Sequence, residues 1–550
     1  MSRRKLAPAQ GPGTPHAYDY LVVGAGSAGC VLAARLSEDP TVRVALIESG
    51  GPDRRGKPEI RIPAAFPQLF KTSYDWDFST TRQEALDGRE LYWPRGHMLG
   101  GSSSMNAMMW VRGHRDDYDA WGEAAGHEWG YDDFVRYFRR AERWTGEAPA
   151  HSGYGTEGPL FISPPRDPSP LTAAFLDACR EEGLRELPEL NGPDHSGFAV
   201  TPLNQRRGSR WSAADGYLRP ARRRPNLDVL TGARVRRLRF APGSRRVVGV
   251  EVDGVPGTRI LAARREVVLS AGAIGSPYLL LHSGIGDPDE LGALGIEVRV
   301  VSPEVGRHLQ DHLSTAVTLR CPDPITLTGA DTPANLARYL LAGRGPLTSN
   351  VAEAVAFVRS GPGLDAPDLE LIFAPVPFIG HGLTAPTEHG LTIGVVLLQP
   401  ASAGRLTLGG PDPDVPPRID PGYLTDPGGT DLRRIVAGVR HAESLFAGRA
   451  LAPYTSGPMG HYPGVVDDAE LTAALRGSLE TLYHPTGTCR MGRDAQSVTD
   501  PRLRVRGVDG LRVVDASVMP NITRGHTHAP TVALAEKAAE LLREDARQAR

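Results

Sequence analysis

The stretch that decides the fold is YDYLVVGAGSAGCVLAARLSEDPTVRVALIESG, which runs from Tyr18 to Gly50. A short apolar run from Tyr20 to Val23 predicts a buried strand, and the apolar pattern from Cys30 to Leu36 predicts a helix. A second apolar run, Val42 to Ile47, predicts another strand. Strand, helix and strand in this order predict a βαβ unit, the building block of a parallel sheet.

The turn between the first strand and the helix has the spacing G-x-G-x-x-G. Gly24 permits the tight turn, Gly26 lets the backbone approach a pyrophosphate, and Gly29 lets helix and strand pack closely. Ser27 and Ala28 lie within this turn, and the free N–H groups and positive dipole end at the N-terminus of the helix that follows favour phosphates. These features together predict a dinucleotide-binding site.

The second strand ends on an acidic residue. Glu48 lies 19 residues after Gly29 and is followed by Ser49. A carboxylate at this distance is placed to accept hydrogen bonds from a ribose. It would repel a 2′-phosphate, which disfavours NADP. The unit alone does not separate FAD from NAD.

The composition is that of an ordinary globular protein. The chain has 550 residues, enough for two or more domains, with 40% hydrophobic and 23% charged residues. A net charge of −2 gives no reason to expect a nucleic-acid partner. The four cysteines are far apart, so we expect no disulfide framework, no metal site and a cytoplasmic location.

No run of about 18 apolar residues is present, so no transmembrane helix is expected. Residues 1–16 combine basic residues with Pro, Gly and Gln and lack an apolar core. They predict a disordered tail and not a signal peptide.

A second informative stretch is WPRGHMLGGSSSMNAMMWVRG, residues 93–113. Its adjacent glycines, serines and asparagine would expose N–H and hydroxyl groups that could cradle a cofactor. From composition alone, a plain surface loop fits equally well. The serines lack the G-x-S-x-G elbow of a hydrolase nucleophile.

This stretch resembles the first signature of the glucose–methanol–choline (GMC) oxidoreductases, flavoproteins that bind FAD and oxidise alcohols. The second signature is matched by GAIGSPYLLLHSGIG at residues 272–286, and VGRHLQDH at residues 305–312 is similar to a further family block. The resemblance extends from about Tyr18 to Leu542 and is strongest to the choline dehydrogenase-like branch.

The resemblance implies an α/β fold with a Rossmann-like FAD-binding domain that is discontinuous in sequence. Residues 17–315 would form the N-terminal part, with a substrate-domain insertion at about 150–210. Residues 316–475 would form a substrate domain on a large antiparallel sheet, where runs at 365–378, 391–398 and 405–408 predict strands. Residues 476–550 would return to the FAD domain with the catalytic residues.

The resemblance also implies which residues contact FAD. They lie in the glycine turn, the acidic strand end, the glycine–serine loop, the 230–238 strand, the second signature and the C-terminal motifs. They are Gly24, Gly26, Ser27, Ala28, Gly29, Glu48, Ser49, Gly100, Gly101, Ser102, Ser103, Asn106, Ala107, Val235, Ala271, Asp515, Ala516, His526, Thr527, Pro530 and Thr531.

The chain departs from the family pattern in three places. His97 stands where Lys or Arg is usual, and His308 stands where Asn is usual. Some relatives carry a histidine at the position of Met105 and bond FAD covalently through it. Methionine cannot form that bond, so the expected FAD is noncovalent.

We expect the catalytic residues in two C-terminal motifs. Histidine suits a base near neutral pH, and His484 in LYHPTGTCRMG matches the family's catalytic histidine. The second member of the pair precedes the last helix, whose first turn is marked by Pro530. His528 has the spacing of that second member, and His526, offset by two, is its competitor.

The implied reaction is oxidation of a small alcohol to an aldehyde or ketone. His484 would take the hydroxyl proton, His528 would hydrogen-bond the developing alkoxide, and a hydride would pass to flavin N5. The last helix would point its N-terminus at the flavin and stabilise negative charge there. Electrons would then go to oxygen, a quinone or another carrier, and the protein would be a monomer or homodimer.

Two other classes stay open. A family member could bind FAD without net alcohol oxidation, as hydroxynitrile lyases and photodecarboxylases do, although the pair of histidines argues against a photodecarboxylase. A non-catalytic flavin-binding protein would have no need of those histidines.

Overall fold

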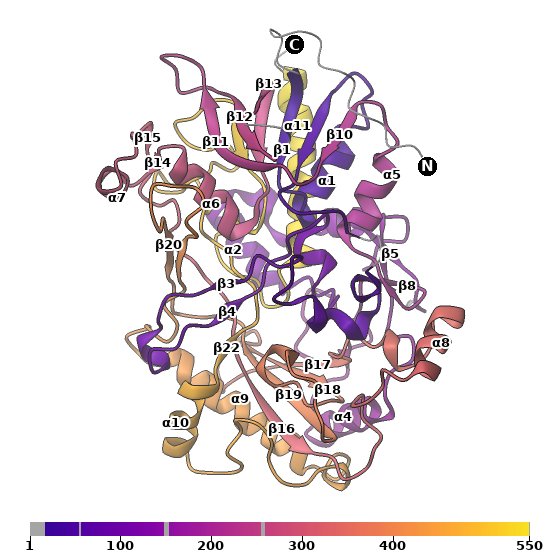
Figure 1. Ribbon diagram of the computed structural model, residues 1–550. Coiled ribbons are helices and arrows are strands. Elements are labelled where there is room, and N and C mark those ends of the chain that lie inside the picture. Colours follow the sequence, from indigo (N-terminus) through magenta and orange to yellow (C-terminus); the bar gives the residue numbers. More distant parts are fainter. Residues whose placement is uncertain (1–16, 54–56, 148–152, 255–258, 549–550) are drawn as a thin grey trace.

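The computed structural model describes residues 17–53, 57–147, 153–254 and 259–548. Two large sheets form opposite ends of the molecule, with loops and short helices between them (Figure 1). The segment 1–16, expected to be a disordered tail, lies outside the described residues.

The first sheet is built on the predicted βαβ unit. Its strands are β1 Ala17–Val23, β2 Val44–Ile47, β10 Leu227–Leu230, β11 Arg234–Phe240, β12 Val247–Asp253, β13 Arg259–Leu269 and β23 Leu511–Val513. The order is β10-β2-β1-β13-β12-β11, and β23 also pairs with β13. Five strands run parallel, namely β10, β2, β1, β13 and β23. β12 is antiparallel to both of its neighbours, β13 and β11.

Two helices from opposite ends of the chain pack together on this sheet. α1 Ser27–Leu36 follows β1, and α11 His528–Gln548 lies beside it (Figure 1). Six of the seven residues of β1 are buried. Because strands covered on both faces need apolar residues at successive positions, Tyr20–Val23 of β1 form a continuous apolar run without alternation.

The predicted boundaries of the βαβ unit need small corrections. The helix begins at Ser27 and not at Cys30, because the second half of the glycine turn is already helical. The second strand begins at Val44 and not at Val42, because the Val42 N–H donates to Asp39 O in a turn. The predicted order of elements is confirmed.

The second sheet is antiparallel throughout. Its strands are β7 Gly197–Val200, β16 Leu313–Arg320, β17 Ala354–Val358, β18 Leu369–Ala374, β19 Gly390–Leu397 and β22 Glu480–Thr481. Their order is β22-β16-β19-β18-β17-β7. With the parallel sheet at the other end, this confirms the expected α/β fold class.

The outer face of the second sheet is covered by α9 Thr430–Ala447. A methyl group on Gly438 would overlap the side chain of Val395, so helix and sheet are in close contact. Side chains alternate across a strand. Val395 therefore faces α9, whereas its neighbours Gly394 and Val396 line a cavity on the other face.

The other predicted strands differ in length or partner. β18 covers only the middle of the predicted strand at 365–378, because Pro375 and Pro377 follow it and proline cannot donate to the ladder. The run at 405–408 forms β20 Arg405–Thr407. It pairs with β21 Arg418–Asp420 in a separate two-stranded sheet.

The remaining α-helices are α2 Arg115–Ala125, α3 Tyr131–Ala141, α4 Pro170–Glu181, α5 Arg219–Ala221, α6 Gly272–His282, α7 Pro288–Ala293, α8 Pro333–Ala342 and α10 Asp468–Ser478. The short strands are β3 Phe78–Ser79, β4 Tyr92–Trp93, β5 Glu142–Trp144, β6 Leu160–Ile162, β8 Gln205–Arg206, β9 Ser209–Arg210, β14 Ile285–Gly286 and β15 Val300–Val301. Within the described ranges, no helix has both the length and the apolar character needed to cross a bilayer.

Candidate functional site

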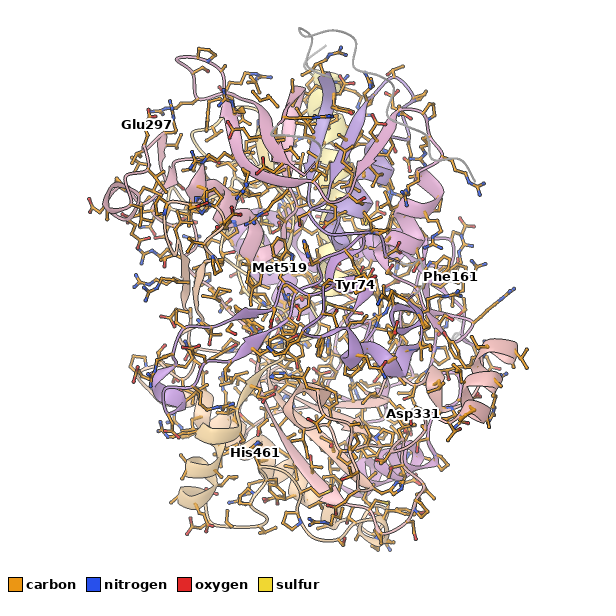
Figure 2. All side chains as sticks on the ribbon, in the orientation of Figure 1. Tyr74, Phe161, Glu297, Asp331, His461 and Met519 are labelled. Atoms are coloured by element: carbon orange, nitrogen blue, oxygen red, sulfur yellow. The ribbon has the colours of Figure 1, made fainter. Side chains whose placement is uncertain are left out.

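A cavity of about 930 Å³ lies between the two sheets. The β1–α1 turn and the start of α11 line one part, and β16, β18 and β19 line another. His461, labelled on the side of the antiparallel sheet in Figure 2, belongs to this second part. Of the site residues expected from the sequence, three do not line the cavity, namely Gly29, Gly100 and Pro530.

The glycine turn shows why each glycine is needed. Gly24 has φ of +95°, and a side chain there would also lie 2.5 Å from Ser270 O. A methyl group on Gly29 would overlap the carbonyl oxygen of Gly24, so α1 could not pack on β1. A methyl group on Gly26 would meet no protein atom within 4 Å. The space beside Gly26, at the N-terminus of α1, therefore fits a pyrophosphate.

Glu48 lies in the cavity wall beside the glycine turn. Its carboxylate accepts hydrogen bonds from the N–H groups of Ala25 and Gly50, both at 2.8 Å. Burial raises the pKa of Glu48, and these N–H groups act in the opposite direction. The side chain is thus held in place at the cavity wall, as a ribose acceptor requires.

The glycine–serine loop brings Asn106 to the cavity. Asn106 Oδ1 accepts from Arg210 Nη1 at 2.8 Å and from the Met108 N–H at 3.1 Å. Because two donors hold the oxygen, the amide orientation is fixed and its Nδ2 donors are left for the cavity. Burial lowers the pKa of Arg210 to about 9.

Asp515 has a structural role that is visible in its contacts. Its Oδ2 accepts from the Gly272 N–H at 2.9 Å and from Ser276 Oγ at 2.6 Å. Its Oδ1 accepts from the Ser517 N–H at 2.9 Å, which caps the short helix after β23. The carboxylate therefore ties the start of α6 to the C-terminal motif at the cavity wall.

His484 belongs to a chain of hydrogen bonds that fixes its tautomer. His312 Nε2 lies 3.1 Å from Leu398 O, which can only accept, so this nitrogen carries the proton. His312 Nδ1 lies 3.0 Å from His484 Nδ1. In neutral His312 that nitrogen is the acceptor, so His484 Nδ1 donates. The lone pair of His484 is then on Nε2, and His484 lines the cavity.

The backbone of His484 is fixed by the neighbour of His312 in sequence. Asp311 Oδ1 accepts from the His484 N–H at 2.6 Å. Asp311 Oδ2 accepts from the hydroxyls of Thr481 and Tyr423, both at 2.5 Å. Two consecutive residues thus hold His484, one through its main chain and one through its ring.

The ring of His526 lies beside His484. The two ring centroids are 4.8 Å apart at an interplanar angle of 82°. On its other side, His526 Nε2 lies 3.1 Å from Oε1 of the buried Glu370 on β18. The carboxylate accepts from this nitrogen and fixes the ring next to His484.

His528, expected from its spacing to pair with His484, lies elsewhere in the cavity wall. Its Nδ1 is 2.9 Å from Ser27 Oγ, and its ring packs edge-on against Trp110. The reason is local, because α11 begins at His528 and packs against α1, so the side chain meets the glycine turn. The contacts favour His526 over His528 as the partner of His484.

Burial favours the neutral form of His484, His312 and His528. The pKa of His484 is lowered well below its usual value, first by burial and then by His526, His312 and Arg95. Burial also lowers the pKa of His312 to about 3 and that of His528 to about 4. A neutral His484 is the form that can accept a proton.

The part of the cavity against the antiparallel sheet is largely apolar and aromatic. Phe66 packs on Phe70 and Phe378, with ring centroids 5.9 and 6.1 Å apart. Glu480 is a polar group in this wall, with Oε2 3.2 Å from His381 Nε2. Burial raises the pKa of Glu480 to about 6. This part of the cavity suits an organic substrate of modest size.

Sequence reasoning missed His312, Asp311, Glu370 and Arg210 as site residues. His312 and Asp311 end the quoted VGRHLQDH block, so a histidine beside an acid was the available signal. Glu370 and Arg210 lie on strands far from the C-terminal motifs in sequence. Among the described residues, no group of three or more potential metal ligands is placed to hold a metal ion.

Comparison with known proteins gives a consistent result. The GMC oxidoreductase family models match residues 18–314 and 400–535. A GMC-type oxidoreductase of Mycobacterium bovis is 51% identical, over 96% of this chain and 99% of that protein. An alcohol dehydrogenase [acceptor] of Pseudomonas putida is 40% identical, over 96% and 95%. The mitochondrial choline dehydrogenase of Homo sapiens is also 40% identical, over 99% and 92%.

The fold comparison agrees. The crystal structure of pyridoxine 4-oxidase from Mesorbium loti matches with a TM-score of 0.86 and 36% identity, over 95% of this chain and 98% of that one. The family models cover the parallel sheet and the C-terminal histidine motifs but not residues 315–399, which hold most of the antiparallel sheet. The relatives span nearly the whole chain, both sheets included. The chain belongs to the GMC oxidoreductase family.

Proposed function

We propose that this protein oxidises a small-molecule alcohol to an aldehyde or ketone, with FAD bound in the cavity between the sheets. The proposal rests on the chain of hydrogen bonds that runs from Leu398 O through His312 to His484. It leaves an unprotonated Nε2 on a partly buried, neutral imidazole in the cavity wall, which is what a general base requires.

The residues present fit FAD. The open space at Gly26 suits a pyrophosphate, Glu48 suits a ribose, and Asn106 offers amide donors further along the cavity. FAD, when bound, supplies a ring system that accepts a hydride. Met105 is buried in this wall and has no nucleophilic nitrogen, so the proposed attachment is noncovalent.

His484 and His526 would both act on the substrate hydroxyl, in different roles. His484 Nε2 would accept its proton while Nδ1 remains bonded to His312. His526, held by Glu370, would orient the oxygen. The N-terminus of α11, with Thr527 and Thr531 in the cavity wall, adds the positive end of a helix dipole that favours negative charge in the cavity.

The proposal extends to the domain division and the acceptor. The parallel sheet would be the core of the FAD-binding domain, and the antiparallel sheet the core of the substrate domain. This division approximates the boundaries 17–315, 316–475 and 476–550, with β7 as the inserted strand. It departs from them at β16, which begins at Leu313, and at β22, which adds Glu480–Thr481 to the antiparallel sheet. The Pseudomonas putida relative is named an alcohol dehydrogenase [acceptor], and oxygen or a quinone-like carrier is the proposed acceptor here.

The test compares three histidine variants of the FAD-loaded protein in steady-state alcohol oxidation. His484→Ala removes the general base and is expected to lower kcat by about 10²- to 10⁴-fold. His526→Ala is expected to lower both kcat and kcat/KM, because it removes the group that orients the hydroxyl. His528→Ala is the matched control, expected to weaken FAD retention more than turnover. Full activity of His484→Ala would refute the proposed function.

A further inference from the structure

The surface of α8 carries a cluster of exposed leucines. Leu336, Leu340 and Leu341 are 40%, 68% and 89% exposed. Large apolar side chains exposed as a contiguous group on one helix usually mark an interaction site. In Figure 1, α8 lies at the margin of the molecule, away from both sheets.

These leucines lie on one face of the helix. At 100° per residue, six exposed apolar positions occupy a continuous arc, and the exposed Ala342 lies outside it. The six are Pro333, Ala334, Leu336, Ala337, Leu340 and Leu341. Tyr339 points the other way and is buried, with its hydroxyl 2.7 Å from Ser209 Oγ and donating to Arg61 O at 3.1 Å. The helix is thus anchored by its polar side, and its apolar side is exposed.

Basic residues surround the C-terminal end of this helix. Arg338 and Arg344 are exposed, and both lie within ion-pair distance of Asp167, at 4.0 and 2.8 Å. Arg206 and Arg207 are also exposed, and the Arg207 backbone contacts Gly343 at the end of α8. Two of these arginines flank Asp167 and the other two belong to the segment beside Gly343, so this rim carries more positive than negative charge. Asp331 lies at the other end of the helix (Figure 2).

We propose that the apolar face of α8 and these four arginines, together the leucine-helix surface, dock on an anionic lipid bilayer. An apolar helix face with basic residues at its edge is the pattern of interfacial helices. Anionic lipid headgroups complement the arginines. Two copies of this surface facing each other would bring like charges together, so a second copy of the chain is the poorer occupant.

The leucine-helix surface is connected to the cavity wall. Tyr339 packs in one cluster with Ile62, Ala65 and Leu347. Ile62 precedes the short helix Pro63–Leu69 and Ala65 belongs to it, and Phe66 of the same helix lines the cavity. Docking would therefore place an apolar segment of the cavity wall next to the bilayer, which would favour exchange of membrane-dissolved alcohols or acceptors.

The test is co-sedimentation of the full-length protein with vesicles of phosphatidylcholine alone and of phosphatidylcholine mixed with phosphatidylglycerol. Binding to the mixed vesicles, weakened by salt, is expected. The triple variant Leu336→Ser, Leu340→Ser, Leu341→Ser is expected to bind about tenfold more weakly or worse. Val465→Ser is the matched control, since Val465 is 81% exposed on another part of the surface.

The variant Arg338→Gln, Arg344→Gln is expected to lose only the preference for phosphatidylglycerol. The far-ultraviolet circular dichroism of each variant should be unchanged, because the mutated side chains are exposed. Equal vesicle binding by the triple variant and wild type, or no binding by wild type, would overturn the proposal. So would a dimer in analytical ultracentrifugation that only the leucine variant abolishes, since that would assign the surface to a second copy.

Discussion

At the scale of single residues, the site depends on where the protons lie along Leu398, His312 and His484. Only one arrangement satisfies all three groups when His312 is neutral, because Leu398 O cannot donate. His312 would thus act as a positioning residue that selects the reactive tautomer of His484. This role can be separated from packing by a conservative replacement.

His312→Leu and His312→Gln make that separation. Leucine cannot accept from His484 Nδ1, so His312→Leu should lower kcat by more than about tenfold, part of the roughly 10²- to 10⁴-fold contribution of a general base. Glutamine can donate to Leu398 O and accept from His484, so His312→Gln should recover part of the rate. Steady-state kinetics at saturating alcohol measures both. Equal rates for the two variants would contradict the positioning role.

The lowered pKa of His484 predicts the pH profile. Burial, with help from His526, His312 and Arg95, disfavours protonated His484. The unprotonated base therefore persists below its ordinary pKa of about 6.5. The acid limb of kcat/KM should lie below that value. His526→Asn removes one lowering influence, so its acid limb should move to higher pH. An unshifted limb in this variant would contradict the electrostatic account.

His484 could be predicted from the sequence because it lies within a short local motif. The proposed choice of His526 over His528 could not be made from the sequence, since it depends on which of the two side chains the start of α11 directs towards Ser27. Glu370 and Arg210 act across the fold, from strands distant in sequence. Contacts between residues this far apart in the chain produce no recognisable spacing in a single sequence.

At the scale of elements, the glycines of the β1–α1 turn have separable roles. Gly29→Ala should destabilise the apo-protein, because the added methyl group overlaps Gly24 and displaces α1. Gly26→Ala should leave apo-protein stability unchanged, because its methyl group meets no protein atom within 4 Å. It should weaken FAD binding about tenfold or more by filling the pyrophosphate space. Thermal unfolding and FAD fluorescence titration measure the two effects. Unchanged FAD affinity in Gly26→Ala would remove the pyrophosphate assignment.

The packing of α11 against α1 relies on a buried carboxylate. Glu536 accepts from Arg35 Nη2 at 2.7 Å and from Tyr217 Oη at 2.7 Å, and it lies 3.1 Å from Arg140 Nε. Glu536→Ala would leave the partly buried Arg35 without its partner and should cost about 3–5 kcal/mol of unfolding free energy.

Glu540→Ala, one turn further along α11, is the matched control. Glu540 pairs with Arg136 at 3.1 Å in a partly exposed position. Its replacement should cost less than about 1 kcal/mol. Denaturant unfolding of the apo-proteins compares the two. A small effect for both variants would show that packing alone holds α11 in place.

The elements themselves were largely predictable where the sequence carries a strong local pattern. β1, α1 and β2 follow from apolar runs and glycine spacing, and β19 follows from a continuous apolar run. The length of β18 was overestimated because the run extends past Pro375. The separate pairing of β20 depends on β21, whose three residues are too short a pattern to predict a strand.

At the scale of the whole molecule, the cavity exists because two sheets face each other across segments from many parts of the chain. The family resemblance predicts both sheets and their approximate spans. It does not predict the shape of the cavity, because part of the wall consists of side chains from segments outside the sheets, such as 66–70, 350–352 and 378–381. Their positions are set by packing between elements and not by local sequence.

Because both sheets line the cavity, bound FAD should stabilise the whole molecule. A ligand that binds only the folded state adds about 2.7 kcal/mol to the unfolding free energy at a concentration of 100 times its Kd. Removal of FAD should therefore lower the melting temperature, and its return should restore it. Differential scanning calorimetry of apo- and FAD-loaded protein measures this. Identical melting temperatures, with FAD present in excess, would contradict a site between the sheets.

The most direct test of the central claim is an anaerobic titration of the FAD-loaded protein with a panel of alcohols, followed by flavin absorbance. We predict bleaching of the flavin by at least one alcohol in the wild type, and much slower bleaching by the same alcohol in His484→Ala. Equally fast bleaching in His484→Ala would contradict the assignment of the base. A protein that takes up FAD but is bleached by no alcohol in a broad panel would contradict alcohol oxidation.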